Sequence, residues 1–175
     1  MAATYTLISS QVLGSNTATI TFSSIPQTYT DLKLVSSASS TRAYYTDSLL
    51  MVINGDTGSN YSETYFAATQ AGANASRQSN LTYIRGDAFM TGTSGTSNTF
   101  ANNEIYIPNY SSTGTKQLFI SSAAEVNGTS VYSTPDINAN LYRGTSAITS
   151  FTLSSETGSN FTTNSSFYLY GLKNA

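Results

Sequence analysis

Hydrophobic and polar residues alternate with a period of two along much of this chain. In residues 17–22 apolar or small side chains alternate with threonine, and residues 31–35 and 103–107 alternate in the same way. This period is typical of a β-strand with one buried face, whereas an amphipathic helix repeats its apolar positions every three to four residues. The pattern therefore predicts strands along the whole chain and almost no helix.

Ten short strands are predicted on this basis, at residues 4–8, 17–22, 31–35, 48–53, 63–68, 81–85, 103–107, 116–122, 146–153 and 166–172. Clusters of Gly, Asn, Asp and Ser between them mark turns. The Ala-rich segment 66–76 contains Gly72 and has no apolar stripe of helical spacing, so we expect the end of a strand that runs into a loop. The Gly-, Ser- and Thr-rich segment 86–101 is expected to be a long surface loop.

Short strands separated by polar turns are typical of a sandwich or a closed barrel. A chain of 175 residues without a shift in composition fits one domain that can bury a sizeable core. We therefore expect an all-β fold, a single antiparallel β-sandwich of jelly-roll type over residues 1–175, with both terminal strands in the sheets. The alternation predicts these core side chains: Leu7, Ile20, Phe22, Leu32, Leu34, Leu50, Val52, Ile105, Ile107, Leu118, Ile120, Phe151, Leu153, Tyr168 and Tyr170.

The composition excludes several kinds of chemistry. Charged residues make up 9% of the chain, and polarity comes instead from 56 Ser and Thr and 15 Asn residues. The sequence has no His and no Cys, which excludes thiol nucleophiles, histidine bases, zinc sites and iron–sulfur clusters. The nine carboxylates show no spacing typical of a catalytic pair. We therefore assign no catalytic, cofactor-binding or metal-binding residue and expect a protein that is not an enzyme.

Charge and hydropathy also limit the partners. The net charge is −2, whereas a nucleic-acid-binding surface needs a basic stripe. The longest apolar run, residues 49–53, is five residues long and far too short for a membrane-spanning helix. We expect neither a nucleic acid nor a membrane as partner.

One loop has the oxygen-rich pattern of a calcium site. Residues 54–60 carry oxygen side chains at alternate positions, as calcium-binding loops do. The loop lacks their acidic density and has no closing Glu, and a hairpin turn accounts for every residue in it. Both interpretations remain open at this point.

Aromatic residues suggest where the chain meets a partner. It contains 13 Tyr and 8 Phe, and Tyr44 and Tyr45 follow closely on Arg42 in a segment between strands. Tyr and Arg are enriched at the centres of protein interfaces, so Arg42, Tyr44 and Tyr45 are candidate partner contacts. The alternative is that Arg42 is a solvated loop charge. For a carbohydrate partner the candidates are Tyr44, Tyr45, Asn60 and Tyr61.

Four segments resemble the small virion structural proteins of aquatic tailed bacteriophages. These are TYTLISS at residues 4–10, ITFSSIPQTYTDLKL at 20–34, VINGD at 52–56 and FYLYGLK at 167–173. The resemblance extends from the first predicted strand to the last. It implies a jelly-roll module on a phage head, as a decoration or cement protein, or on a tail fibre, and it carries over no active-site residue.

The resulting expectation is a non-enzymatic virion protein that decorates or cements the capsid. Its partners would be the major capsid protein or other virion proteins, and the symmetry of a shell favours a homotrimer. It would be made in the cytoplasm of the bacterial host and reside in the virion, without a cofactor. The alternative is a tail-fibre or fibre-tip module that binds carbohydrate on the host surface.

Overall fold

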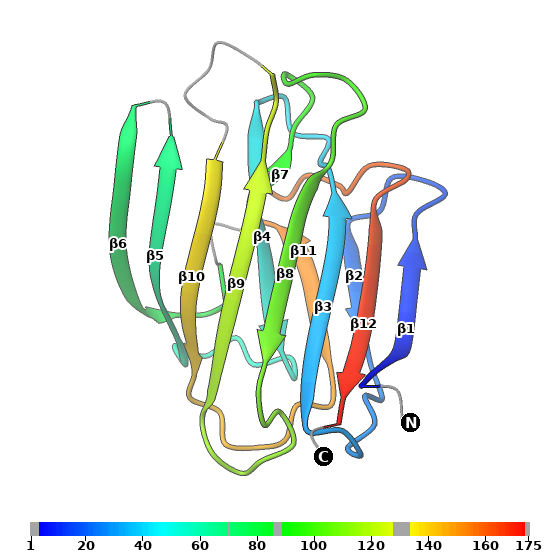
Figure 1. The fold of residues 1–175 in the computed structure, drawn as a ribbon, viewed down its shortest axis with the longest axis vertical. Coiled ribbons are helices and arrows are strands. Elements are labelled where there is room, and N and C mark those ends of the chain that lie inside the picture. Colours follow the sequence, from blue (N-terminus) through cyan, green and yellow to red (C-terminus); the bar gives the residue numbers. More distant parts are fainter. Residues whose placement is uncertain (1–3, 70, 86–88, 128–133, 174–175) are drawn as a thin grey trace.

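The chain folds into two antiparallel β-sheets that pack face to face (Figure 1). The computed structural model describes residues 4–69, 71–85, 89–127 and 134–173, and within these ranges it contains strands and no helix. The all-β antiparallel sandwich predicted from the alternation is therefore confirmed, and both terminal strands lie in the large sheet.

The large sheet has eight strands and the small sheet has four. The order in the large sheet is β1 (Tyr5–Val12), β12 (Ser166–Leu172), β3 (Asp31–Ala38), β8 (Ala101–Ile107), β9 (Lys116–Ala124), β10 (Thr134–Tyr142), β5 (Tyr61–Thr69) and β6 (Gly72–Leu81). The order in the small sheet is β2 (Thr19–Phe22), β11 (Phe151–Ser155), β4 (Thr46–Ile53) and β7 (Phe89–Thr91).

The chain passes from one sheet to the other in pairs of consecutive strands, as a jelly roll does. The order in the small sheet, β2-β11-β4-β7, runs parallel to the order β1-β12-β3-β8 in the large sheet. Each of the consecutive pairs β1 and β2, β11 and β12, β3 and β4, and β7 and β8 therefore contributes one strand to each sheet. Within the described ranges, the remaining strands β9, β10, β5 and β6 have no counterpart in the small sheet. Figure 1 shows β5 and β6 extending to one side of the small sheet.

The core lies between the sheets and is built from side chains in register. Leu34, Ile105 and Ile120 face each other across β3, β8 and β9, and Phe22 packs on Phe151 with ring centroids 5.2 Å apart. Burial of such side chains is the main force that holds two sheets together. Ten predicted core residues are buried: Ile20, Phe22, Leu32, Leu34, Ile105, Ile107, Leu118, Ile120, Phe151 and Leu153.

The prediction of a core position is wrong for five residues, and four of these share one physical reason. Leu50, Val52, Tyr168 and Tyr170 lie in strands that are apolar on both faces, so the alternation has no unique phase there. The buried residues are instead Leu49, Met51 and Ile53 in β4, and Phe167 and Leu169 in β12. Leu7 lies in edge strand β1 and is 51% exposed.

Several strand boundaries also differ from the prediction. Residues 66–69 end β5 as predicted, but residues 72–76 begin β6 where a loop was expected. Strand β7 lies within the predicted loop 86–101, and β10 was not predicted at all. The predicted strand 81–85 contributes only the end of β6 and an isolated bridge between Ile84 and Met51. In β10 the inward positions are polar and the outward ones apolar, which is the reverse of an ordinary half-buried strand.

Candidate functional site

The large apolar side chains that remain exposed are gathered on one surface. Within the described ranges they are Tyr5, Leu7, Val12, Phe66, Phe119 and Ile137, each about half exposed or more. The strand register places them on the face of the large sheet that is turned away from the small sheet, which we call the outer face. Large apolar side chains gathered on one face indicate a contact surface, whereas single scattered ones need no explanation.

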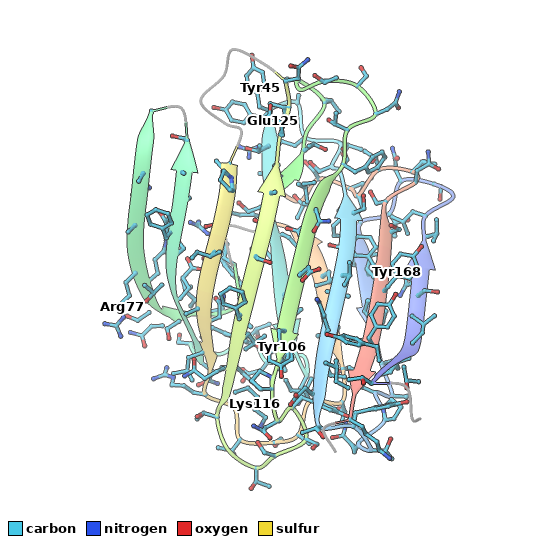
Figure 2. All side chains as sticks on the ribbon, viewed as in Figure 1. Tyr45, Arg77, Tyr106, Lys116, Glu125 and Tyr168 are labelled. Atoms are coloured by element: carbon cyan, nitrogen blue, oxygen red, sulfur yellow. The ribbon has the colours of Figure 1, made fainter. Side chains whose placement is uncertain are left out.

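Two rows of directly paired residues cross the outer face from one edge of the sheet to the other. The first row is Leu7, Tyr170, Lys33, Tyr106, Phe119, Ala139, Thr64 and Arg77. The second row is Ser10, Tyr168, Val35, Glu104, Ser121, Ile137, Phe66 and Ala75. Figure 2 looks onto this face, with Tyr106 near its middle, Tyr168 toward the β1 edge and Arg77 at the β6 edge.

The apolar part of the outer face is centred on three side chains. Ile137 pairs directly with Phe66 on β5, and Phe119 lies on β9, on the other side of β10. Two shallow hollows of ≈ 270 Å³ each adjoin them, and both are lined by Phe66 and Ile137. Aromatic and aliphatic side chains beside hollows are the usual anchors of a protein–protein contact.

The outer face is close to electrically neutral. The charged residues in its two rows are Lys33, Glu104 and Arg77, and Lys33 Nζ lies 2.7 Å from Glu104 Oε2. Tyr106 donates its hydroxyl hydrogen to Asp31 Oδ2 at 2.6 Å. The carboxylate of Asp31 is therefore also engaged within the protein. A partner must therefore be held by apolar and hydrogen-bonding contacts, because few charges are available for attraction across an interface.

The inner face of the large sheet carries a polar row that sequence reasoning missed. Ser36, Asn103, Ser122 and Asp136 pair in sequence across β3, β8, β9 and β10, and all four are buried. Among the residues that the structure describes, the amide nitrogen and oxygen of Asn103 have no hydrogen-bond partner. No group of three or more acidic residues that could hold a metal ion occurs in the described ranges.

The predicted contact residues Arg42, Tyr44 and Tyr45 do lie together. The guanidinium carbon of Arg42 lies 4.7 Å from the centre of the Tyr44 ring, and the rings of Tyr44 and Tyr45 are 5.8 Å apart. Arg42 Nη1 donates to the carbonyl of Thr46 at 2.9 Å, so part of its hydrogen-bonding capacity serves the loop. Figure 2 places Tyr45 at one end of the sandwich, away from the centre of the outer face.

Two residues proposed for a carbohydrate contact are structural instead. Tyr61 is 1% exposed, stacks on Tyr142 at 4.9 Å and donates to the carbonyl of Asp56 at 2.7 Å, so its role as an exposed sugar-stacking ring is wrong. Asn60 is half-buried and donates to Asp56 Oδ2 at 2.9 Å. Both side chains thus hydrogen-bond to Asp56 and stabilise the turn.

The oxygen-rich loop 54–60 is a hairpin turn closed by its own hydrogen bonds. Asp56 Oδ1 accepts the backbone N–H of Gly58 at 2.8 Å, and Asp56 Oδ2 accepts Asn60 and the Tyr142 hydroxyl. These bonds, led by the one from Gly58, lower the pKa of Asp56. Because the carboxylate is already engaged on both oxygens, the geometry favours the hairpin interpretation over the calcium interpretation.

We expect the protein to lose stability as the pH rises above about 10. Burial, followed by the hydrogen bond to Asp56, raises the pKa of Tyr142 to about 12. The hydrogen bond to Asp31 raises the pKa of Tyr106 to about 12, and burial raises the pKa of Tyr61. The unfolded chain releases these protons from pH about 10 while the folded chain keeps them, so rising pH favours unfolding.

Thermal unfolding midpoints measured across this alkaline range would test the expectation. The double variant Tyr106→Phe/Tyr142→Phe should show a shallower decline, because it lacks two of the groups that titrate differently in the two states. A midpoint that stays constant up to pH about 12 would contradict it.

Comparison with known proteins gives no family assignment. No protein-family model and no curated protein matches the chain. Among solved structures, BuGH16Bwt matches with 10% identity and a TM-score of 0.23, over 80% of this chain and 60% of that one. SCLam, a non-specific endo-beta-1,3(4)-glucanase from family GH16, matches with 8% identity and a TM-score of 0.22, over 83% of this chain and 58% of that one.

The chain thus spans about three fifths of the length of these two structures. At such low TM-scores the likeness carries no argument about activity, and the functional inference rests on the geometry of this molecule. A search of the described residues finds no helix with the length and hydropathy needed to cross a membrane.

Proposed function

We propose that this protein is a non-enzymatic structural protein of a phage virion that decorates or cements the capsid. The observation that carries the proposal is that the six large apolar side chains exposed within the described ranges all lie on the outer face of the large sheet. The protein would lay this face on the shell, against the major capsid protein or another virion protein. The resemblance of residues 4–10, 20–34, 52–56 and 167–173 to phage virion proteins points in the same direction.

The size of the outer face suits a stable contact. Eight strands spaced by ~4.8 Å give a width of roughly 34 Å, and strands of this length are about 25 Å long. The resulting area of roughly 800 Å² matches what one partner buries in a standard interface. A broad and nearly neutral face of this size is suited to contact with another protein surface, and it offers few charges to a small charged ligand.

Decoration would stabilise the shell by adding contact area across neighbouring capsid subunits. A homotrimer at a threefold position would give each copy an equivalent environment, since closed symmetric assemblies repeat one interface. The small number of charges predicts that attachment is insensitive to salt, because screening weakens exposed ion pairs and leaves buried apolar contacts in place.

The test uses virions assembled with substituted protein. We expect Phe66→Ser/Phe119→Ser to reduce the number of bound copies at least tenfold, as counted by quantitative mass spectrometry of purified virions. Both side chains are about half exposed, so the double variant should keep the wild-type unfolding midpoint to within a few degrees. Tyr45→Ser, at the end of the sandwich, serves as the matched control and should bind normally.

The wild-type protein should remain on the virion through washes in ~1 M salt, where the Debye length is about 3 Å. Release of most copies by salt would show an ionic attachment and overturn the proposed mode of contact. Normal incorporation of Phe66→Ser/Phe119→Ser would remove the outer face as the attachment surface. Absence of the wild-type protein from purified virions would overturn the virion role itself.

A further inference from the structure

A polar pocket lies at one end of the sandwich, apart from the outer face. Its volume is ≈ 350 Å³, and it is formed where the loop 92–100 meets residues 162–164 and Asn16. Figure 1 shows the connections β7–β8, β11–β12 and β1–β2 at this same end. Among the described residues that line it, none carries a charged side chain, and Phe100 supplies the one aromatic ring.

The pocket is held in shape by hydrogen bonds between the loops that form it. The Thr163 N–H donates to Asn16 Oδ1 at 3.1 Å, and the Thr162 N–H donates to the carbonyl of Ser39 at 2.9 Å. Gly92 allows the loops to meet closely, because a Cβ at this position would lie 2.3 Å from the carbonyl oxygen of Tyr44. A ligand would therefore enter a preformed site and lose little affinity to the ordering of loops.

The threonine hydroxyls of the lining point their hydrogens away from a ligand. Thr99 Oγ1 donates to the carbonyl of Thr96 at 2.6 Å, Thr96 Oγ1 to that of Val126 at 2.5 Å, and Thr93 Oγ1 to that of Arg42 at 3.1 Å. Each hydroxyl oxygen retains lone pairs that can accept a hydrogen bond. Because each hydroxyl is already donating, it is also polarised into a better acceptor.

Two asparagines supply donors beside these acceptors. Asn98 and Asn164 line the pocket, are exposed, and hold left-handed backbone conformations with φ of 60° and 70°. Within the described ranges neither side-chain amide has a hydrogen-bond partner or other polar contact. Each amide has two N–H donors and one carbonyl acceptor available to a ligand.

From this arrangement we infer that the end pocket binds a neutral saccharide. A sugar hydroxyl both donates and accepts, so it needs the combination of fixed acceptors and amide donors that Thr93, Thr99, Asn98 and Asn164 provide. The ring of Phe100 offers an apolar surface for the C–H face of a sugar, as aromatic side chains in ligand sites commonly do. The volume lies at the lower end of the range for small-ligand pockets and fits one or two sugar units.

The lining also argues against charged ligands. A carboxylated or sulfated sugar would be desolvated in the pocket without a cationic partner, which is costly. The guanidinium of Arg42 is directed at Thr46 and at the Tyr44 ring. This binding site is independent of the proposed attachment through the outer face, since the two surfaces use different residues.

The test measures binding of the purified protein to an array of neutral and acidic glycans, followed by titration calorimetry with the best neutral oligosaccharide. We expect Asn98→Gly/Asn164→Gly to weaken binding at least tenfold. Glycine removes both amides and adopts positive φ freely, so the loop backbone is preserved. Asn109→Gly is the matched control, because Asn109 has a φ of 50° and is exposed outside the pocket, and it should bind as the wild type does.

Each other outcome overturns the inference. Binding of no neutral glycan at millimolar concentration would show that the pocket is not a saccharide site. Equal binding by Asn98→Gly/Asn164→Gly and the wild type would place the glycan elsewhere, and selective binding of acidic glycans or of peptides would show a different ligand class. Phe66→Ser/Phe119→Ser should bind the glycan normally, so failure of this inference is separable from failure of the attachment surface.

Discussion

Replacing Lys116 with methionine is expected to lower the free energy of unfolding by about 2–4 kcal/mol. Lys116 is 1% exposed, and its Nζ donates to three carbonyl oxygens, those of Ser112 at 2.8 Å, Gly114 at 2.6 Å and Ser146 at 2.9 Å. One ammonium group thus joins the β8–β9 connection to the β10–β11 connection. Methionine fills a similar volume and leaves three carbonyls without their donor.

Chemical denaturation of Lys116→Met and of Lys33→Met would measure the effect. Lys33 is the matched control, because it is a partly exposed lysine of the same sheet that pairs with Glu104 on the outer face. Lys33→Met should lower the free energy of unfolding by less than about 1 kcal/mol, as is usual for the loss of an exposed ion pair. Equal stability of Lys116→Met and the wild type would show that the three carbonyls find water once the ammonium is gone, and that this junction does not stabilise the fold.

Exchanging Asn103 for aspartate should destabilise the protein by about 3–5 kcal/mol at neutral pH, whereas exchange for leucine should stabilise it by about 1–2 kcal/mol. Asn103 is 1% exposed in the centre of the large sheet, and neither polar atom of its amide has a hydrogen-bond partner in the described part of the chain. Aspartate has the same shape and adds a charge that the interior cannot solvate. Leucine removes the polar group whose burial is uncompensated.

The pH dependence of the stability of Asn103→Asp provides a further test. Burial should raise the pKa of the new carboxyl, so that it folds in its neutral form when the solution is acidic enough. The stability difference between Asn103→Asp and the wild type should therefore shrink as the pH falls from about 7 toward about 4. A destabilising Asn103→Leu would contradict this account, because it would show that the amide is satisfied by buried water in solution.

Much of the fold was predictable because strand alternation is a local signal of burial. The side chains of Ile20, Phe22, Ile105 and Ile107 alternate with polar neighbours, and all four are in the core. The same signal failed for β4 and β12, where apolar side chains occupy both faces. It also failed for β10, where Asp136 points inward and Ile137 outward.

The candidate sites were predictable only in part. The sequence indicated Arg42, Tyr44 and Tyr45 as a cluster because they are near neighbours in the chain, and they do lie together. Phe66, Phe119 and Ile137 are far apart in the sequence and meet through the pairing of β5, β10 and β9. The end pocket likewise joins residues near positions 16, 98 and 164.

By itself, the sequence determined the all-β class, the absence of thiol and imidazole side chains and the burial of ten of the fifteen side chains predicted for the core, because these depend on composition and on neighbours within one strand. Tertiary structure decided which face of each strand is covered, since the small sheet lies against only part of the large one. It also decided the outer face and the end pocket, because both arise from register between strands and from loops that meet at one end. Residues distant in the chain become neighbours only when the backbone hydrogen bonds of the sheets are in place.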